Sequence, residues 1–109
     1  MSAPPKKKTL PTKINIFGRD ILVRREEMKE GEFGEYEQHK YLIKISKRSD
    51  INEARQTLFH EAIHAALHIS GLSMVLPDND GIDLEEAIVV CLENAFGHLI
   101  DVDKFKLDK

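Results

Sequence analysis

The first half of the chain alternates hydrophobic and polar residues, a pattern that predicts half-buried β-strands. In residues 13–25, KINIFGRDILVRR, the letters FGRD interrupt the alternation, which predicts a hairpin with its turn near Gly18. Residues 36–45 predict a second hairpin, in which a turn around Gln38 and His39 separates Tyr36 from the alternating positions Tyr41, Ile43 and Ile45. The polar, glycine-containing stretch between the two hairpins is expected to be a loop. The predicted product is a sheet of three or four strands that is mainly antiparallel.

From residue 49 the hydrophobic positions recur with the period of a helix. Asp50, with Glu53 three residues later, forms a capping-box pattern, and Gly71 supplies a C-terminal stop. Apolar side chains cover well over half of the circumference of this predicted helix, so we expect it to be mostly buried. Its remaining polar lane carries Thr57, His60, Glu61, His64 and His68.

A second helix is predicted to begin at Asp83, where Glu86 completes another capping-box pattern. Its apolar positions are so numerous that little of it is expected to face water. Cys91, the only cysteine, lies among them and is expected to be a buried, inert thiol. The connection between the two helices could fold over a cleft, and residues 101–109 look like a fraying tail.

Strands followed by two helices indicate an α+β fold, in which a small sheet packs on the first helix and a second helix lies C-terminal. The 109 residues are 41% hydrophobic and 32% charged, as expected of one globular domain, which we place at residues 13–109. Residues 1–12 combine prolines with three lysines and are predicted to be a flexible basic tail.

The composition also narrows the function classes. A net charge of −3 is too mild to indicate nucleic-acid binding by the folded part, and three lysines in a tail are a weak signal for it. No segment approaches the roughly 20 apolar residues that span a membrane, and the N-terminus lacks the apolar run of a secretion signal. A cytoplasmic location is therefore expected.

The histidine lane holds the candidate chemistry. His60 and His64 are four residues apart, so on a helix their side chains stand one turn apart on the same face. Two imidazoles at this spacing can bind one tetrahedral zinc ion, each nitrogen about 2.0–2.1 Å from the metal. Glu61, rotated by about 100° from His60, can take a proton from a zinc-activated water. H-E-x-x-H thus predicts two ligands and a general base, against the alternative of a solvated histidine edge.

The other histidines lack ligand spacing. His68 lies eight residues after His60, which is about 12 Å along a helix axis, so one ion cannot easily hold all three. We expect His68 at the rim of the site or exposed to solvent. His39, in a turn, and His98, near a helix end, are not expected to be ligands.

The third ligand is expected from the second helix, which offers Glu85, Glu86 and Glu93. A carboxylate on a nearly apolar helix needs a partner. For Glu86 the capping box competes with a ligand role, and Glu85 could instead be favoured by the helix dipole. The residues alone leave all three open.

The sequences YLIKIS, TLFHEAIHAALHISGL and LENAFGHLI together resemble the small zincins encoded by phages and prophages. These zincins are related to the ImmA/IrrE family of metallopeptidases, a compact branch of the gluzincins. The resemblance covers about residues 12–100 and implies a minimal zincin-like fold with one zinc ion. It assigns His60 and His64 as ligands and Glu61 as the catalytic base.

The family's third ligand is a glutamate on the next long helix, and the broader gluzincin pattern there is Glu, two residues, a small residue and then Asp or Asn. Neither EEAIV from Glu85 nor EAIVV from Glu86 completes that pattern. Glu86 is favoured because EAIVVCLEN most resembles the phage form of this helix, with Glu85 and then Glu93 as alternatives.

The resemblance further implies that an edge strand binds an extended peptide beside the zinc. The strand that ends at Ile45 and Ser46 is the candidate edge. A residue that stabilises the oxyanion is also expected, and Tyr36, Tyr41 and His68 are all candidates.

The leading hypothesis is a zinc-dependent metallopeptidase that acts on a protein or peptide, in the host cytoplasm if the protein is phage-encoded. The alternative is a catalytically silent zincin-like domain, a zinc-stabilised protein-binding module. The missing Asp or Asn after the candidate ligand favours this alternative slightly.

Overall fold

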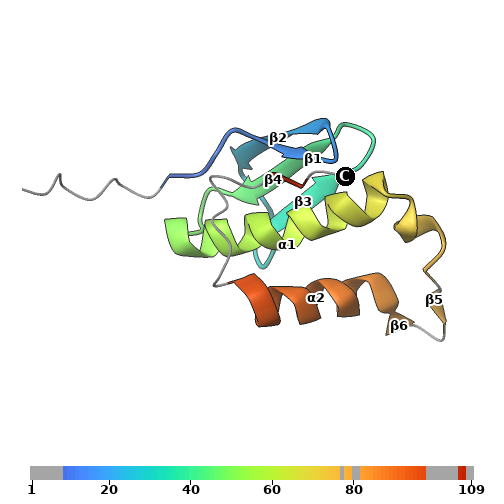
Figure 1. Cartoon of the computed structure of the whole chain (residues 1–109). Helices are drawn as coiled ribbons and strands as arrows, with labels where there is room; N and C mark the ends of the chain where they lie inside the picture. Colours follow the sequence, from blue (N-terminus) through green and yellow to red (C-terminus); the bar gives the residue numbers. More distant parts are fainter. Residues whose placement is uncertain (1–8, 77, 80–81, 98–105, 108–109) are drawn as a thin grey trace, which may run out of the picture.

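The computed structural model describes residues 9–76, 78–79, 82–97 and 106–107 of the chain. In these residues the predicted α+β fold is confirmed. Helix α1 lies between a small sheet, which packs on one of its faces, and helix α2, which lies along the opposite face of α1 (Figure 1). The helices are α1 (Ile51–Ile69), the short 3₁₀ turn η1 (Leu72–Met74) and α2 (Leu84–Phe96). The strands are β1 (Lys13–Ile16), β2 (Arg19–Glu26), β3 (Gly34–Glu37), β4 (Leu42–Ser46), β5 (Asp78–Asn79), β6 (Ile82–Asp83) and β7 (Lys106–Leu107).

Both predicted hairpins are confirmed. Strands β1 and β2 are joined by Phe17 and Gly18, whose φ angles of 52° and 88° are typical of the tight turns that match strand twist. Strands β3 and β4 pair antiparallel around a turn that ends at Tyr41, with a φ of 49°. Tyr41 therefore belongs to the turn, and the strand begins one residue later.

The sheet is mixed, whereas the sequence predicted a mainly antiparallel one. Its order is β3-β4-β2-β1-β7, and β2 and β4 pair parallel, as do β1 and β7. Strand β4 is thus internal, and the prediction that the strand ending at Ile45 and Ser46 forms the edge was wrong. The physical reason is visible in LIKIS, where side chains on both faces are buried, as in a central strand. The described edge on this side is β3, which pairs with β4 alone.

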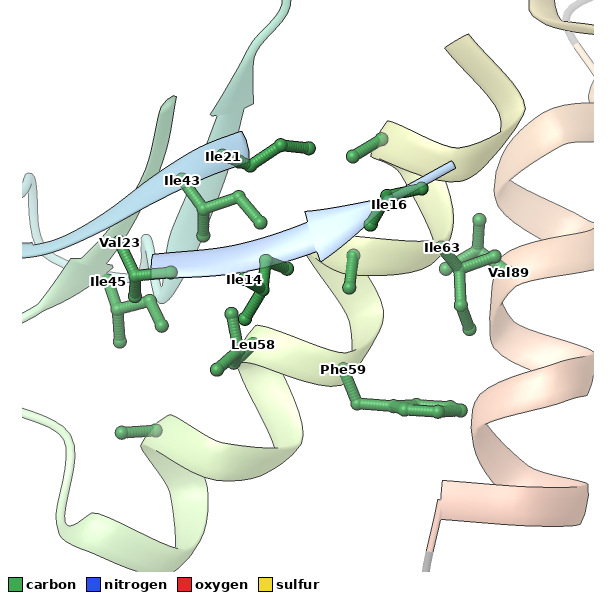
Figure 2. Packing of buried hydrophobic residues seen from close by; sticks show 13 residues of the cluster. Ile14, Ile16, Ile21, Val23, Ile43, Ile45, Leu58, Phe59, Ile63 and Val89 are labelled. Carbon is green, nitrogen blue, oxygen red and sulfur yellow. The ribbon is translucent and has the colours of Figure 1, made fainter. Parts of the chain in front are cut away.

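The core lies between the sheet and α1, and Figure 2 shows isoleucine and valine side chains of the strands pointing at that helix. Its fully buried large side chains are Ile16, Ile21, Ile43, Ile45, Leu58 and Val89. The predicted bounds of α1 hold because both caps form. The Asp50 carboxylate accepts a hydrogen bond of 2.8 Å from the Glu53 N–H, and Gly71 takes the left-handed conformation with a φ of 86°.

Helix α2 is much more exposed than its apolar sequence predicts. Val89 is its one buried residue, and it packs toward α1 (Figure 2). Val90 and Phe96 are 40% and 50% exposed. Cys91 is exposed, so the prediction of a buried thiol was wrong. The reason is that α2 is the outer layer: α1 covers one of its faces, and no other described element covers the opposite one.

The two ends of the chain also differ from the prediction where they are described. Residues 9–12, placed in the predicted flexible tail, contact the folded domain: Leu10 packs on the core, and the Thr12 carbonyl accepts a hydrogen bond of 2.9 Å from Val23. Residues 106–107, expected to fray, pair with β1. Residues 1–8, with the three lysines, lie outside the described residues. No helix among the described residues is long and apolar enough to cross a membrane.

Gly34 sets how closely β3 approaches α1. A Cβ atom at this position would overlap the Cγ2 methyl of Thr57 and lie 3.1 Å from the Lys44 carbonyl oxygen and 3.6 Å from Cγ of Glu61. Since Thr57 is β-branched and stiff within a helix, it cannot easily rotate away. Only glycine therefore lets the edge strand lie this near to Glu61.

We expect Gly34→Ala to lower the free energy of unfolding by about 1–3 kcal/mol, because overpacking must shift the strand or the helix. Denaturant unfolding of a double-mutant cycle with Thr57→Ala measures the cause. Most of the loss should disappear in the Thr57→Ala background, where the overlapping methyl is absent. An equal loss in both backgrounds would show that Thr57 is not responsible.

Candidate metal centre

Helices α1 and α2 run antiparallel and bring His60, His64 and Glu86 together. The Nε2 atom of His60 lies 3.0 Å from Oε1 of Glu86, and Nε2 of His64 lies 2.7 Å from Oε2 of the same carboxylate. One potential ligand atom from each residue falls within 4.8 Å of the other two. The two imidazoles, whose ring centroids are 5.2 Å apart, therefore converge on one carboxylate.

This donor set fits a zinc ion. Two ligands of a tetrahedral zinc about 2.0–2.1 Å from the metal are about 3.3 Å from each other. The nitrogen-to-oxygen distances of 3.0 and 2.7 Å are shorter than that separation, as hydrogen bonds are, so a bound zinc ion would require the Glu86 carboxylate to move slightly outward. Two histidines and one glutamate are also a combination found in catalytic zinc sites, where the fourth position stays open for water or substrate.

The position of Glu86 is compatible with both roles that competed for it in the sequence. The Asp83 side chain caps α2 by accepting a hydrogen bond of 3.0 Å from the Glu86 N–H. Capping thus uses the backbone of Glu86, while its side chain points to the imidazoles of His60 and His64. The capping box does not exclude a ligand role.

Glu85 and Glu93, the other two candidates, contact the other nitrogen, Nδ1, of the two imidazole rings. Glu93 Oε2 is 2.6 Å from Nδ1 of His60, and Glu85 Oε2 is 2.6 Å from Nδ1 of His64. A carboxylate at Nδ1 fixes the imidazole so that its Nε2 lone pair faces the metal position, an arrangement common around metal-bound histidines. The antiparallel helix pair explains the assignment, since the start of α2 lies beside the later histidine and its end beside the earlier one.

Positive charge at the Nε2 atoms favours the contacts with Glu86. An imidazole whose Nδ1–H donates to a carboxylate presents a lone pair at Nε2, and this lone pair repels the Glu86 oxygens unless a proton or metal ion lies between them. Burial lowers the pKa of His64, but the carboxylates of Glu85, Glu61 and Glu86 outweigh it, and the net pKa is raised. A divalent metal ion would supply the positive charge at Nε2 of both imidazoles.

Glu61 lies beside this group on the first helix and is 9% exposed. Burial raises the pKa of its carboxyl group, and the opposing effects of His64 and His60 do not cancel the rise. The carboxylate accepts a hydrogen bond from the backbone of Tyr36 on the edge strand. Strand β3 thus holds the candidate base in place.

Two cavities meet at this centre. One, of about 550 Å³, extends along the start of β3 and of α1, and the other, of about 480 Å³, extends toward η1 and the start of α2. Gly34, His60 and Glu61 line both. A continuous groove therefore follows the edge strand past the candidate metal ligands and the candidate base.

Two of the three candidate oxyanion residues line the second cavity. Tyr36 Oη lies 2.8 Å from Nδ1 of His68, and burial, followed by the nearby Tyr41, raises the pKa of Tyr36 to about 12. Tyr41 stacks with Arg19, whose guanidinium carbon is 4.0 Å from the ring centroid, and it does not line the cavity. His68 lies at the rim of the site, away from the metal position. His39 is exposed in its turn, and His98 lies outside the described residues.

Sequence reasoning missed two features of the centre: the contacts of Glu85 and Glu93 with Nδ1, and the backbone contact from β3. The sequence contained a partial signal of the first feature, because Glu86 and Glu93 are seven residues apart and so lie on the same face of a helix. The second had none, because it depends on which strand forms the edge of the sheet.

Comparison of the chain with models of protein families, with curated protein sequences and with solved structures gave no match. Any assignment of function therefore depends on the residues of this centre and on their geometry.

Proposed function

We propose that the protein is a zinc-dependent metallopeptidase with a zincin-like fold. The observation that carries this proposal is the convergence of His60, His64 and Glu86 on one point, with Glu61 beside them and an open groove along the edge strand. Three protein ligands leave one coordination position free, as in catalytic rather than structural zinc sites.

His60, His64 and Glu86 would hold the metal. When bound, zinc supplies an acidified water and polarises the carbonyl to be attacked. Glu85 and Glu93 keep the two imidazoles in the tautomer that presents Nε2 to the metal position. Three carboxylates of α2 thus contact the same pair of histidines.

Glu61 acts as the general base. Its carboxylate takes the proton of the attacking water and then delivers it to the nitrogen of the leaving amine. The backbone N–H of Tyr36 holds the carboxylate for this transfer. The Tyr36 hydroxyl, which stays protonated at neutral pH, can donate a hydrogen bond to the oxygen that becomes negative, with His68 holding it in place.

The substrate is an extended peptide bound along β3. The outer side of this strand pairs with no other described strand, so it can add a peptide by backbone hydrogen bonds. A peptide in this position runs through the groove, next to Glu61 and the metal ligands.

A binding module that holds zinc without cutting is the second candidate. It is favoured by the residue pattern after Glu86, where EAIVV lacks the Asp or Asn of active gluzincins. Such a module uses the same metal centre and the same groove, so metal binding alone does not separate the two functions.

We expect the purified protein to bind one zinc ion per chain, measured by elemental mass spectrometry. Free zinc at 100 times Kd should add about 2.7 kcal/mol to the free energy of unfolding and raise Tm by about 10 °C or more. His60→Ala should abolish both effects, whereas His68→Ala, one turn beyond the ligands, should keep them. Equal zinc binding by His60→Ala and the wild type would contradict the assigned centre.

We expect variants of the three glutamates of α2 to differ in zinc affinity according to which imidazole nitrogen each glutamate contacts. A zinc titration against a competing chelator measures this affinity. Glu86→Gln should lose measurable affinity, because it removes a charged ligand. Glu85→Gln and Glu93→Gln should each weaken binding by about 10- to 100-fold, the usual effect of removing a carboxylate behind a histidine ligand. A larger loss from Glu85→Gln or Glu93→Gln than from Glu86→Gln would move the ligand role to that residue.

We expect Glu61→Gln to retain one zinc ion and a cooperative unfolding transition but to lose at least about 100-fold in peptide cleavage, because general base catalysis is removed. Cleavage of a complex peptide mixture, read by mass spectrometry, measures the loss, and Glu86→Gln serves as the variant that loses metal and cleavage together. Absence of cleavage by the zinc-loaded wild type would favour the binding module, and unchanged cleavage by Glu61→Gln would exclude Glu61 as the base.

A further inference from the structure

The groove beside the candidate metal centre is lined by carboxylates and, among the described residues, by no lysine or arginine. Glutamates contribute to both cavities and lie on the edge strand, on the loop before it and on both helices. They are Glu32, Glu35, Glu53, Glu61, Glu85, Glu86 and Glu93. A net charge of only −3 for the whole chain means that this acidity is local to the groove.

The lysines and arginines of the described part of the chain do not neutralise this lining. Lys44 lies 3.7 Å from Glu35, but it is also 3.9 Å from Glu26 and 2.5 Å from Glu37, so one positive charge is shared by three carboxylates. One divalent metal ion would offset two of the seven groove carboxylates. The groove would therefore remain strongly negative with the metal in place.

The shape of the groove also suits long cationic side chains. Phe33, at the loop before β3, is 59% exposed and lines the first cavity together with Glu32 and Glu53. An exposed aromatic ring among carboxylates can cover the alkyl stem of a lysine or stack on the guanidinium of an arginine. Lys29 and Arg48 line a smaller, adjoining hollow of about 90 Å³, which shares Glu32, Phe33 and Glu53 with this end of the groove.

We propose that the substrates are basic peptide segments, with lysine or arginine within a few residues of the cleaved bond on both sides. This substrate class rests on the proposed peptidase function. Side chains of an extended peptide alternate in direction, so alternate residues of a strand added to β3 face the helices and their carboxylates. A lysine or arginine there gains attraction, whereas an aspartate or glutamate meets like charge in a partly desolvated groove. Peptides with acidic residues at these positions are excluded.

Binding tests the inference separately from catalysis. The probes are two fluorescein-labelled ten-residue peptides, one with lysine at four alternate positions and one with glutamate at the same positions. Anisotropy is measured on zinc-loaded Glu61→Gln and wild-type protein. We expect the lysine peptide to bind at least about tenfold more tightly at low salt, with the difference falling as salt screens exposed charges.

A pair of double variants distinguishes the effect of the groove carboxylates on binding from the effect of the overall charge. Glu32→Gln with Glu53→Gln removes two carboxylates from the first cavity, whereas Glu27→Gln with Glu30→Gln removes two exposed carboxylates that line neither cavity. Both doubles change the net charge equally. The groove double should weaken binding of the lysine peptide by about tenfold and the control double by less than about twofold. Equal binding of the two peptides, or equal effects of the two doubles, would overturn the proposal.

Cleavage-site sequencing distinguishes the failure of this inference from the failure of the proposed function. Peptides from a mixed digest that the wild type cuts should be enriched in lysine and arginine near the cut and depleted in acidic residues. Cleavage without that preference would overturn the substrate class and leave the peptidase standing. Charge-selective binding without any cleavage would contradict the peptidase and leave a groove that recognises basic peptides.

Discussion

Contacts between glutamates and histidines, rather than apolar burial, govern how helix α2 lies on α1. Val89 is the only fully buried side chain of α2, and Leu92 packs partly buried against the core, so few apolar contacts hold this helix of 13 residues. Along the same face, carboxylates of α2 meet both nitrogens of His60 and His64 at distances of 2.6–3.0 Å. The position of α2, and with it the shape of the groove, therefore depends on the charge state of this polar layer.

That layer carries more negative charge than the protein itself can balance. Four carboxylates surround two imidazoles: three on α2 and Glu61 on α1. Removing carboxylates from water without cations costs free energy, so apolar residues would join two helices more favourably. A divalent cation at the Nε2 atoms would make the arrangement favourable. Metal binding at this centre would then be coupled to the docking of α2, because its binding free energy would contribute to folding.

The sequence was sufficient for features that depend on local interactions. Asp50 and Asp83 cap their helices as predicted because an N-cap uses a backbone N–H only three residues away. The pairing of His60 with His64 follows from helix geometry alone. The turn near Gly18 was likewise predictable, because the side chains and the backbone of a tight turn lie in one short stretch.

Features that depend on contacts far apart in the chain were not predictable. The parallel pairing of β2 with β4 makes β3 the edge, and no pattern within LIKIS identifies its neighbours. The exposure of Cys91 was missed because counting apolar residues does not tell whether anything covers the second face of a helix. The choice among Glu85, Glu86 and Glu93 required the antiparallel direction of α2, which determines the ring nitrogen that each carboxylate meets.

The edge strand connects the fold to the chemistry through two backbone features. The absence of a side chain at Gly34 lets β3 approach α1, and the backbone of Tyr36, two residues later, binds the Glu61 carboxylate. A peptide added to the outer side of β3 would pair with the row of backbone groups that faces away from β4, the same side on which the Tyr36 backbone meets Glu61. Its distance from the base is then set by strand spacing, about 4.8 Å between neighbouring strands, and not by flexible side chains. In the proposed function, the sheet would therefore determine where a substrate lies, and the acidic lining of the groove would determine which peptides can lie there.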